Sequence, residues 1–189
     1  LASFGVPDQY CVDRWNEFAA NGVVGGDNKN HQINIKMSDS QSDSNRAAQV
    51  AGDLINNDGV GIVLVASTPD TVAPVADQCE ALETPCLSND CPWQPYVLSR
   101  SGGDINATFK WTYHNFWGLE DIMANFQNIW DQVPNNKTVG ALWPNDADGN
   151  AYRGEFAPTL TANGYTVVDP GAYQNQTEDF TAQITAFKN

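Results

Sequence analysis

Apolar residues recur along the chain with two different periods, and segments of the two kinds alternate. Apolar positions three to four residues apart predict helices at 8–20, 44–56, 69–83, 118–132, 151–162 and 177–188. Shorter apolar runs predict strands at 32–38, 60–66, 85–88, 113–116, 138–143 and 165–168. The polar stretch 89–110 is expected to be a long loop. The alternation predicts an α/β fold: a doubly wound, mostly parallel sheet with helices on both faces and right-handed crossovers.

The predicted strands differ in whether their apolar residues are continuous or alternate with polar ones. The runs 60–66 and 138–143 are almost entirely apolar, which is typical of strands covered on both faces. The run 32–38 alternates Ile33, Ile35 and Met37 with polar residues and predicts a half-buried strand. The chain opens with a loop at 3–5 that leads into a helix. Because a doubly wound sheet normally begins with a strand, we expect a first strand to be missing, together with everything after residue 189.

Composition narrows the class of protein. The 189 residues include 9 Lys and Arg against 23 Asp and Glu, for a net charge of −14, and 41% are hydrophobic. This share of hydrophobic residues is too high for a disordered chain, so the chain is expected to fold. Its length fits one domain or slightly more. Its acidity repels nucleic acid and anionic membranes. No apolar run long enough to span a bilayer is present. We expect a soluble extracytoplasmic or salt-adapted protein whose signal peptide, if it had one, is already removed.

The four cysteines are Cys11, Cys79, Cys86 and Cys91. Their spacing lacks the close Cys pairs of a zinc site, and both histidines lie far from them in the sequence. An even number of cysteines in an acidic, Lys-poor chain favours disulfides and an oxidising compartment. Four cysteines allow three pairings, among which the sequence does not choose.

Candidate binding residues follow the predicted strands, where ligands bind in open α/β sheets. Ser67 and Thr68 open a helix, and their hydroxyl and N–H groups suit either a bound carboxylate or simple helix capping. The segment 89–93 carries Trp93 beside polar residues, within an aromatic-rich region. Aromatic walls with a few polar groups are typical of ligand pockets.

Motifs for catalysis, nucleotide phosphates and dinucleotides are absent from the sequence. The segment 144–155 partly matches a calcium loop through Asp146, Asp148 and Glu155, but Pro144 stands at the first ligand position and offers no side-chain oxygen. We therefore predict no catalytic residues, no metal, no cofactor and no enzymatic activity.

Four segments together carry a family likeness. They are SDSQSDSNRAAQVAGDLINNDGV, GVGIVLVASTPDTVAPVADQCEALETPCLSND, ALWPNDADGNAY and GYTVVDPGAYQNQTEDFTAQI. In order and spacing, the chain resembles the type I periplasmic solute-binding proteins of ABC transporters, especially the receptors for branched-chain amino acids (leucine, isoleucine and valine).

The resemblance implies a two-lobed receptor that closes on a small solute by hinge motion and delivers it to a membrane permease. Residues 1–117 would form most of lobe one, 118–137 the crossing helix and linker, and 138–189 the start of lobe two. It implies a monomer in the periplasm or outside the cell, free or lipid-anchored, with no nucleic-acid partner. Two alternatives stay open: a ligand-sensing regulatory domain of the same fold, and an α/β hydrolase or transferase.

The resemblance also implies a set of site residues. The family loop that holds an amino acid carboxylate corresponds to Ser67 and Thr68. Where the family often has an aromatic that covers the ligand, this chain has Asp148, which argues against an aliphatic amino acid, and the extra tryptophans favour a bulkier or flatter solute. Asp146 or Asp148 is expected to receive an amino group. The full predicted set is Ser67, Thr68, Asn89, Asp90, Trp93, Trp117, Asp146 and Asp148.

Placed on this family pattern, the cysteines fall into two pairs. Cys79 ends a helix and Cys86 begins the next strand, so a bridge between them is favoured. Cys11 and Cys91 both lie near the ligand-facing edge and form the second expected pair.

Overall fold

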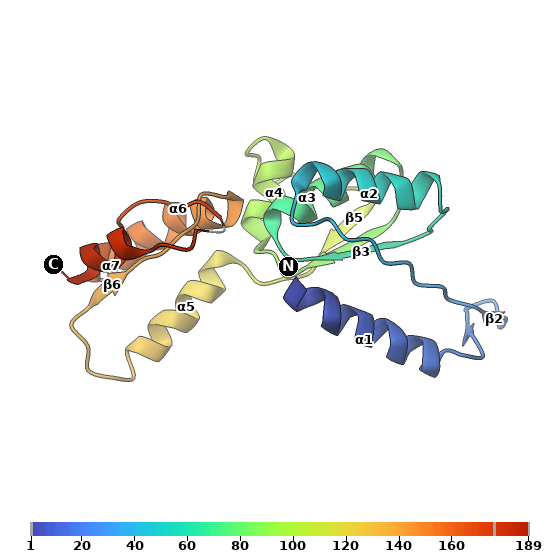
Figure 1. The fold of residues 1–189 in the computed structure, drawn as a ribbon, viewed down its shortest axis with the longest axis horizontal. Coiled ribbons are helices and arrows are strands. Elements are labelled where there is room, and N and C mark those ends of the chain that lie inside the picture. The colour runs from blue at the N-terminus through green and yellow to red at the C-terminus, as the bar shows by residue number, and fades with distance from the viewer. Residues whose placement is uncertain (1, 176, 189) are drawn as a thin grey trace.

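The chain folds into two α/β units that lie side by side along the long axis of the molecule (Figure 1). The structure is a computed structural model that describes residues 2–175 and 177–188. In the first unit, β3 (Val63–Ala66), β4 (Cys86–Asn89) and β5 (Thr112–His114) form a parallel sheet in that order. In the second, β6 (Thr138–Gly140) and β7 (Thr166–Val168) pair in parallel. The predicted α/β fold with parallel sheets and flanking helices is confirmed.

Helices α2 (Ser44–Asn56) and α3 (Pro69–Ala81) cover one face of the first sheet (Figure 1). The helix α2 has the predicted bounds because its apolar stripe is preceded by Asp43, whose Oδ1 accepts a hydrogen bond from the Arg46 N–H at 2.7 Å. Pro69 begins α3, where a missing N–H costs nothing. The two helices and the sheet share a core made of Ala47, Ala51, Val63, Val75, Cys79 and Cys86.

The region predicted as a long loop contains a helix, α4 (Trp93–Ser101), so that prediction was wrong. Pro92 precedes the helix and Pro95 lies in its first turn, where the backbone N–H groups need no helical partner. The helix ends at Gly102, which adopts a left-handed conformation with φ of 66°. The proline, glycine, asparagine and aspartate residues of the segment favour a loop and conceal this short helix.

Arg100, whose side chain is fully buried, joins three elements of the first unit. Its Nε donates to Asp77 of α3 at 2.7 Å, and its Nη1 donates to Thr112 of β5 at 3.0 Å. The guanidinium also lies 3.7 Å from the ring centroid of Phe109 and 4.7 Å from that of Tyr96. The planar, delocalised cation of arginine suits this combination of stacking and several hydrogen bonds.

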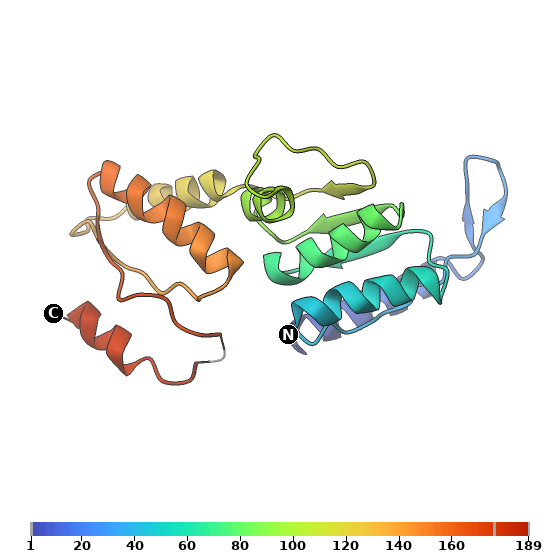
Figure 2. The same cartoon turned by 90° about the horizontal axis from the view of Figure 1, so that it is seen from above.

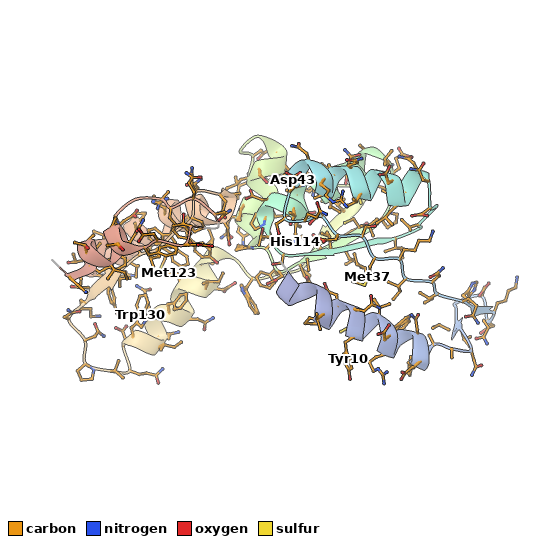
Figure 3. The ribbon with its side chains drawn as sticks, viewed as in Figure 1. Tyr10, Met37, Asp43, His114, Met123 and Trp130 are labelled. Carbon is orange, nitrogen blue, oxygen red and sulfur yellow. The ribbon has the colours of Figure 1, made fainter. Side chains whose placement is uncertain are left out.

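The second unit consists of its strand pair with α5 (Leu119–Trp130), α6 (Ala147–Ala162) and α7 (Thr181–Lys188). Met123 and Trp130, labelled in Figure 3, are two of the α5 residues that contribute to the core of this unit. The helix α6 begins four residues before the predicted start, directly after Asp146. No described helix combines the length and apolarity needed to cross a bilayer. The buried members of the core are Leu119, Met123, Phe156, Leu160 and Tyr165.

The N-terminal region differs most from the expectation. Helix α1 (Ala2–Phe18) includes residues 3–5, which were predicted as a loop. The segment 32–38 is extended but is not a strand, because no neighbouring strand pairs with it. The short strands β1 (Val23–Val24) and β2 (Asn30–His31) instead form an antiparallel pair.

One face of the first sheet remains accessible to solvent. Helix α1 lies on the side of the sheet opposite α2 (Figures 1 and 2), yet Leu64 is 71% exposed and Tyr113 60%. The strand 60–66 is therefore not covered on both faces, as its apolar run predicted. Likewise β6 alternates exposed and half-buried residues.

All four cysteines are free thiols, so neither expected disulfide is formed in the structure. Cys79 and Cys86 do lie together, joined by a thiol hydrogen bond inside the core. Cys11 is exposed on α1, whereas Cys91 is fully buried beside Val72 and Tyr96. The second pair therefore occupies two different environments.

We expect Arg100→Lys to lower the free energy of unfolding by on the order of 2 kcal/mol, because an ammonium group cannot replace the guanidinium contacts to Asp77, Thr112 and the two rings. Urea unfolding followed by circular dichroism measures the change. Arg14→Lys is the matched control, since Arg14 is 52% exposed. Equal midpoints for the two variants would show that Arg100 does not hold the unit together.

Candidate ligand-binding cleft

A cavity of about 500 Å³ lies where the two units meet. It is open to solvent on one side, and residues of both units form its walls. The strand-end loops of the first sheet contribute one wall, α5 a second and the first turns of α6 a third. Its lining residues are Ser67, Thr68, Asp90, Pro92, Phe116, Trp117, Ile122, Asn125, Phe126, Ile129, Asp148 and Tyr152.

The wall from the first unit depends on two sharp turns at the ends of strands. Ser67 follows β3 with φ of 49°, and Asp90 follows β4 with φ of 52°, so each adopts a left-handed conformation that ends its strand. At the first turn, Thr71 Oγ1 accepts from the Thr68 N–H and donates to the Ser67 carbonyl, both at 3.0 Å. These bonds fix the backbone of the serine–threonine loop at the edge of the cavity.

The second turn is held by His114, at the end of β5. Its Nε2 lies 2.7 Å from the Cys91 carbonyl and its Nδ1 lies 2.8 Å from Ser88 Oγ. Because a carbonyl only accepts, Nε2 carries the proton and Nδ1 accepts from the serine hydroxyl. Burial lowers the pKa of this imidazole, and it stacks on Tyr96 with ring centroids 4.2 Å apart. Neutral His114 therefore anchors the loop that presents Asp90.

The third wall begins at the N-terminus of α6. Asp146 caps this helix: its Oδ1 accepts from the Gly149 N–H at 2.8 Å, and its Oδ2 accepts from Asn175 at 2.9 Å. Position 149 needs glycine because a Cβ there would stand 2.1 Å from the Pro144 carbonyl oxygen. The first turn of α6 is thereby held against the end of the preceding strand segment, which places Asp148 in the cavity wall.

The cavity is strongly acidic in character. Burial, followed by the charges of Asp146, Asp70 and Asp90, raises the pKa of Asp148 to about 6. Burial also raises the pKa of Asp70, although the Ala147 backbone N–H bonded to its carboxylate opposes that rise. The same environment raises the pKa of Tyr152 to about 12. Asp148 Oδ1 is buried without a hydrogen-bond partner in the described structure.

The remaining wall is apolar and largely exposed. Phe116 and Trp117 pack at a tilt with ring centroids 4.4 Å apart, and Trp117 is 58% exposed. From α5, Phe126 and Ile129 line the cavity and are also exposed. Helix α5 was not among the elements predicted to form the site. The feature of the sequence that could have indicated it is the unusual width of its apolar stripe, of which only Leu119 and Met123 are buried in the core.

The structure separates the eight predicted site residues into two groups. Those that line the cavity are Ser67, Thr68, Asp90, Trp117 and Asp148. Asn89, Trp93 and Asp146 do not line it.

Each of these three residues occupies a different environment. Asn89 is exposed at the end of β4. Trp93 lies on α4, and its Nε1 donates to Glu120 of α5 at 3.0 Å, which ties the two helices together. Asp146 serves as the helix cap. Among the described residues, no group of three or more His, Cys, Asp or Glu side chains is arranged to hold a metal ion.

Comparison with known proteins gives a family and a set of related folds. A family model described as periplasmic binding protein matches residues 2–189. A comparison with curated protein sequences finds no match. Several solved structures share the fold at low sequence identity.

One is a protein from Rhodopseudomonas palustris strain CGA009, with a TM-score of 0.72 and 17% identity over 99% of this chain and 47% of that one. Another is an ABC-transporter solute-binding protein from R. palustris in complex with 4-hydroxybenzoate, with a TM-score of 0.70 and 17% identity over 94% and 44%. A third is a branched-chain amino acid transporter substrate-binding protein from Streptococcus pneumoniae in complex with isoleucine, with a TM-score of 0.65 and 20% identity over 96% and 47%. The chain thus spans less than half the length of these structures.

Removing the carboxylate of Asp148 should stabilise the unliganded protein at alkaline pH. The pKa of Asp148 in the folded protein is about 6, above the 3.8 of an unperturbed aspartate. The stability that the protonated side chain contributes is therefore fully present below about pH 4 and is lost as the pH rises through 6. Asp148→Asn is expected to raise the melting temperature by a few degrees at pH 8 and to leave it almost unchanged at pH 4. Differential scanning calorimetry at the two pH values measures this.

Glu155→Gln, which removes the same charge from an exposed position on α6, is the control and should show no such pH-dependent gain. A uniform shift at both pH values, or a gain in the control of equal size, would contradict the assignment of the penalty to the Asp148 carboxylate.

Proposed function

This chain belongs to the periplasmic binding protein family, and we propose that it is an extracytoplasmic receptor that captures a small polar solute and delivers it to the permease of an ABC transporter. The solute is an amino acid or a related carboxylate, with or without an aromatic ring. The chain acts by binding, without chemical change to the solute. Delivery to the permease follows from the family and needs its own test.

The observation that carries this proposal is the composition of the cavity. Its volume of about 500 Å³ is that of a site for a small molecule. Both units line it, as binding between two hinged lobes requires. Its hydroxyl and carboxylate groups come from the strand-end turns and from α6, and most of its apolar side chains come from α5 and the segment just before it. A solute with a polar head and an apolar body fits this arrangement.

The roles of individual residues follow from this polarity. Ser67 and Thr68 receive the carboxylate of the solute on the loop fixed by Thr71. Trp117 and Phe126 cover its apolar body. Two of the structural relatives contain solutes of this general form. One is in complex with isoleucine, which is zwitterionic, and the other with 4-hydroxybenzoate, which is aromatic.

The role of Trp117 provides a test. With a solute identified by a thermal-shift screen of amino acids and aromatic acids, Trp117→Ala should weaken binding about tenfold or more, because it removes the largest side chain that lines the cavity. Isothermal titration calorimetry measures the dissociation constant. Since Trp117 is more than half exposed, the variant should keep its fold.

Phe18→Ala is the matched control, since Phe18 is an exposed aromatic residue on α1 that does not line the cavity. Unchanged affinity in both variants would place the binding site elsewhere. If no compound in the screen raises the melting temperature, the receptor function itself loses its support.

A further inference from the structure

The charge lining the cavity has one sign. Asp90 and Asp148 are its charged lining residues, and neither lysine nor arginine is among the side chains that form the walls. Asp70 and Asp146 lie close enough that their charges act on Asp148. A solute whose only charge is negative would therefore enter a region of negative potential without a counter-cation.

Two of the N–H groups that would attract an anion at the start of α6 already face carboxylates of the protein. The Gly149 N–H is bonded to the Asp146 cap, and the Ala147 N–H is bonded to Asp70. A helix N-terminus binds anions through such N–H groups. Because protein carboxylates occupy these two, this end of the cavity is less suited to a second anion than an ordinary helix N-terminus.

The same region contains an acceptor that lacks a donor. Asp148 Oδ1 is buried with no hydrogen-bond partner among the described residues. The aromatic rings of Trp117, Phe116 and Phe126 line the same cavity. Carboxylates combined with aromatic faces favour a cation that donates hydrogen bonds, since both attract positive charge.

We propose that the solute presents a cationic nitrogen to Asp90 and Asp148, and that the cavity rejects solutes that carry only a carboxylate. This inference rests on the proposed receptor function and narrows it. Of the two kinds of solute found in the structural relatives, it selects the amino-group-bearing kind over the benzoate kind. It extends that selection to amines that have no carboxylate at all.

Two sets of matched compounds test the proposal on the 189-residue chain. The first is phenylalanine, phenethylamine and 3-phenylpropionate, and the second is leucine, 3-methylbutylamine and 4-methylpentanoate. Within each set the compounds share one skeleton and differ only in the ammonium and carboxylate groups. We expect the amine and the amino acid of at least one set to bind at least tenfold more tightly than the acid, measured by calorimetry at pH 7.5.

Variants connect the preference to the two carboxylates. Asp90→Asn and Asp148→Asn should each weaken binding of the amine about tenfold and reduce its advantage over the acid. Glu155→Gln, at an exposed α6 residue that does not line this cavity, should change neither. If Asp148→Asn unfolds part of the chain, Asp90→Asn, which alters a loop rather than a helix, still tests whether a carboxylate of the cavity binds the amine.

Proton release gives an independent readout. The pKa of Asp148 is about 6, and the groups that face it are the carboxylates of Asp146, Asp70 and Asp90, the Cys91 thiol and the Tyr152 phenol. A bound cation favours the ionised carboxylate, so amine binding at pH 6 should release a fraction of a proton, and binding at pH 8 almost none. Titrations in buffers of different ionisation enthalpy measure the release.

The outcomes separate this inference from the proposed function. Equal or tighter binding of either acid, or of 4-hydroxybenzoate, would overturn the cation preference while supporting a receptor. Amine binding that neither Asp90→Asn nor Asp148→Asn weakens would overturn the assignment to these carboxylates. If none of the seven compounds bound, both the inference and the receptor function would be contradicted.

Discussion

The cavity depends on how the first turn of α6 is held. Gly149 lets the helix approach the Pro144 carbonyl so closely that a Cβ would not fit, and Asp146 fixes the turn from both of its carboxylate oxygens. The Ala147 N–H then meets Asp70 of α3, which belongs to the first unit. This contact, between a backbone N–H and a side-chain carboxylate, joins the two units. Asp148, between Ala147 and Gly149, then stands in the cavity wall.

The opposite wall is fixed by equally local means. The left-handed conformations of Ser67 and Asp90 turn the chain out of the sheet, and His114 ties the second of these turns to β4 and β5. Beneath this loop, Arg100 joins α3, α4 and β5 from a buried position. The walls are thus attached to sheet and helix rather than to free loops. In a binding site such attachment reduces the ordering cost that a solute must offset.

The parts of the fold that the sequence predicted are those decided within one segment. Helix α2 carries both its apolar stripe and its Asp43 cap in the sequence, so its bounds were predictable. The strand expected at 32–38 was not formed, because a strand also needs a partner, and the alternation of Ile33, Ile35 and Met37 does not say whether one is present. Helix α4 was missed because two prolines obscured a helix that tolerates them in its cap and first turn.

The site shows the same division between local and spatial information. Residues predicted from their position after a strand line the cavity in four cases: Ser67, Thr68, Asp90 and Asp148. Asn89, Trp93 and Asp146 follow strands in the same way but do not line it. Trp93 bonds to Glu120 instead, and Asp146 caps α6. Asp146 and Asp148 lie two residues apart on one helix turn. The Asp146 carboxylate accepts from the Gly149 N–H and the Asn175 side chain, whereas Asp148 Oδ1 has no partner among the described residues. The Asp146 carboxylate is thus hydrogen-bonded within the protein, whereas the Asp148 carboxylate remains available to a group on a bound solute. Together with the exposed rings of Trp117 and Phe126, it also orients a solute, because a charged nitrogen gains beside Asp90 and Asp148 and an apolar body gains beside the rings.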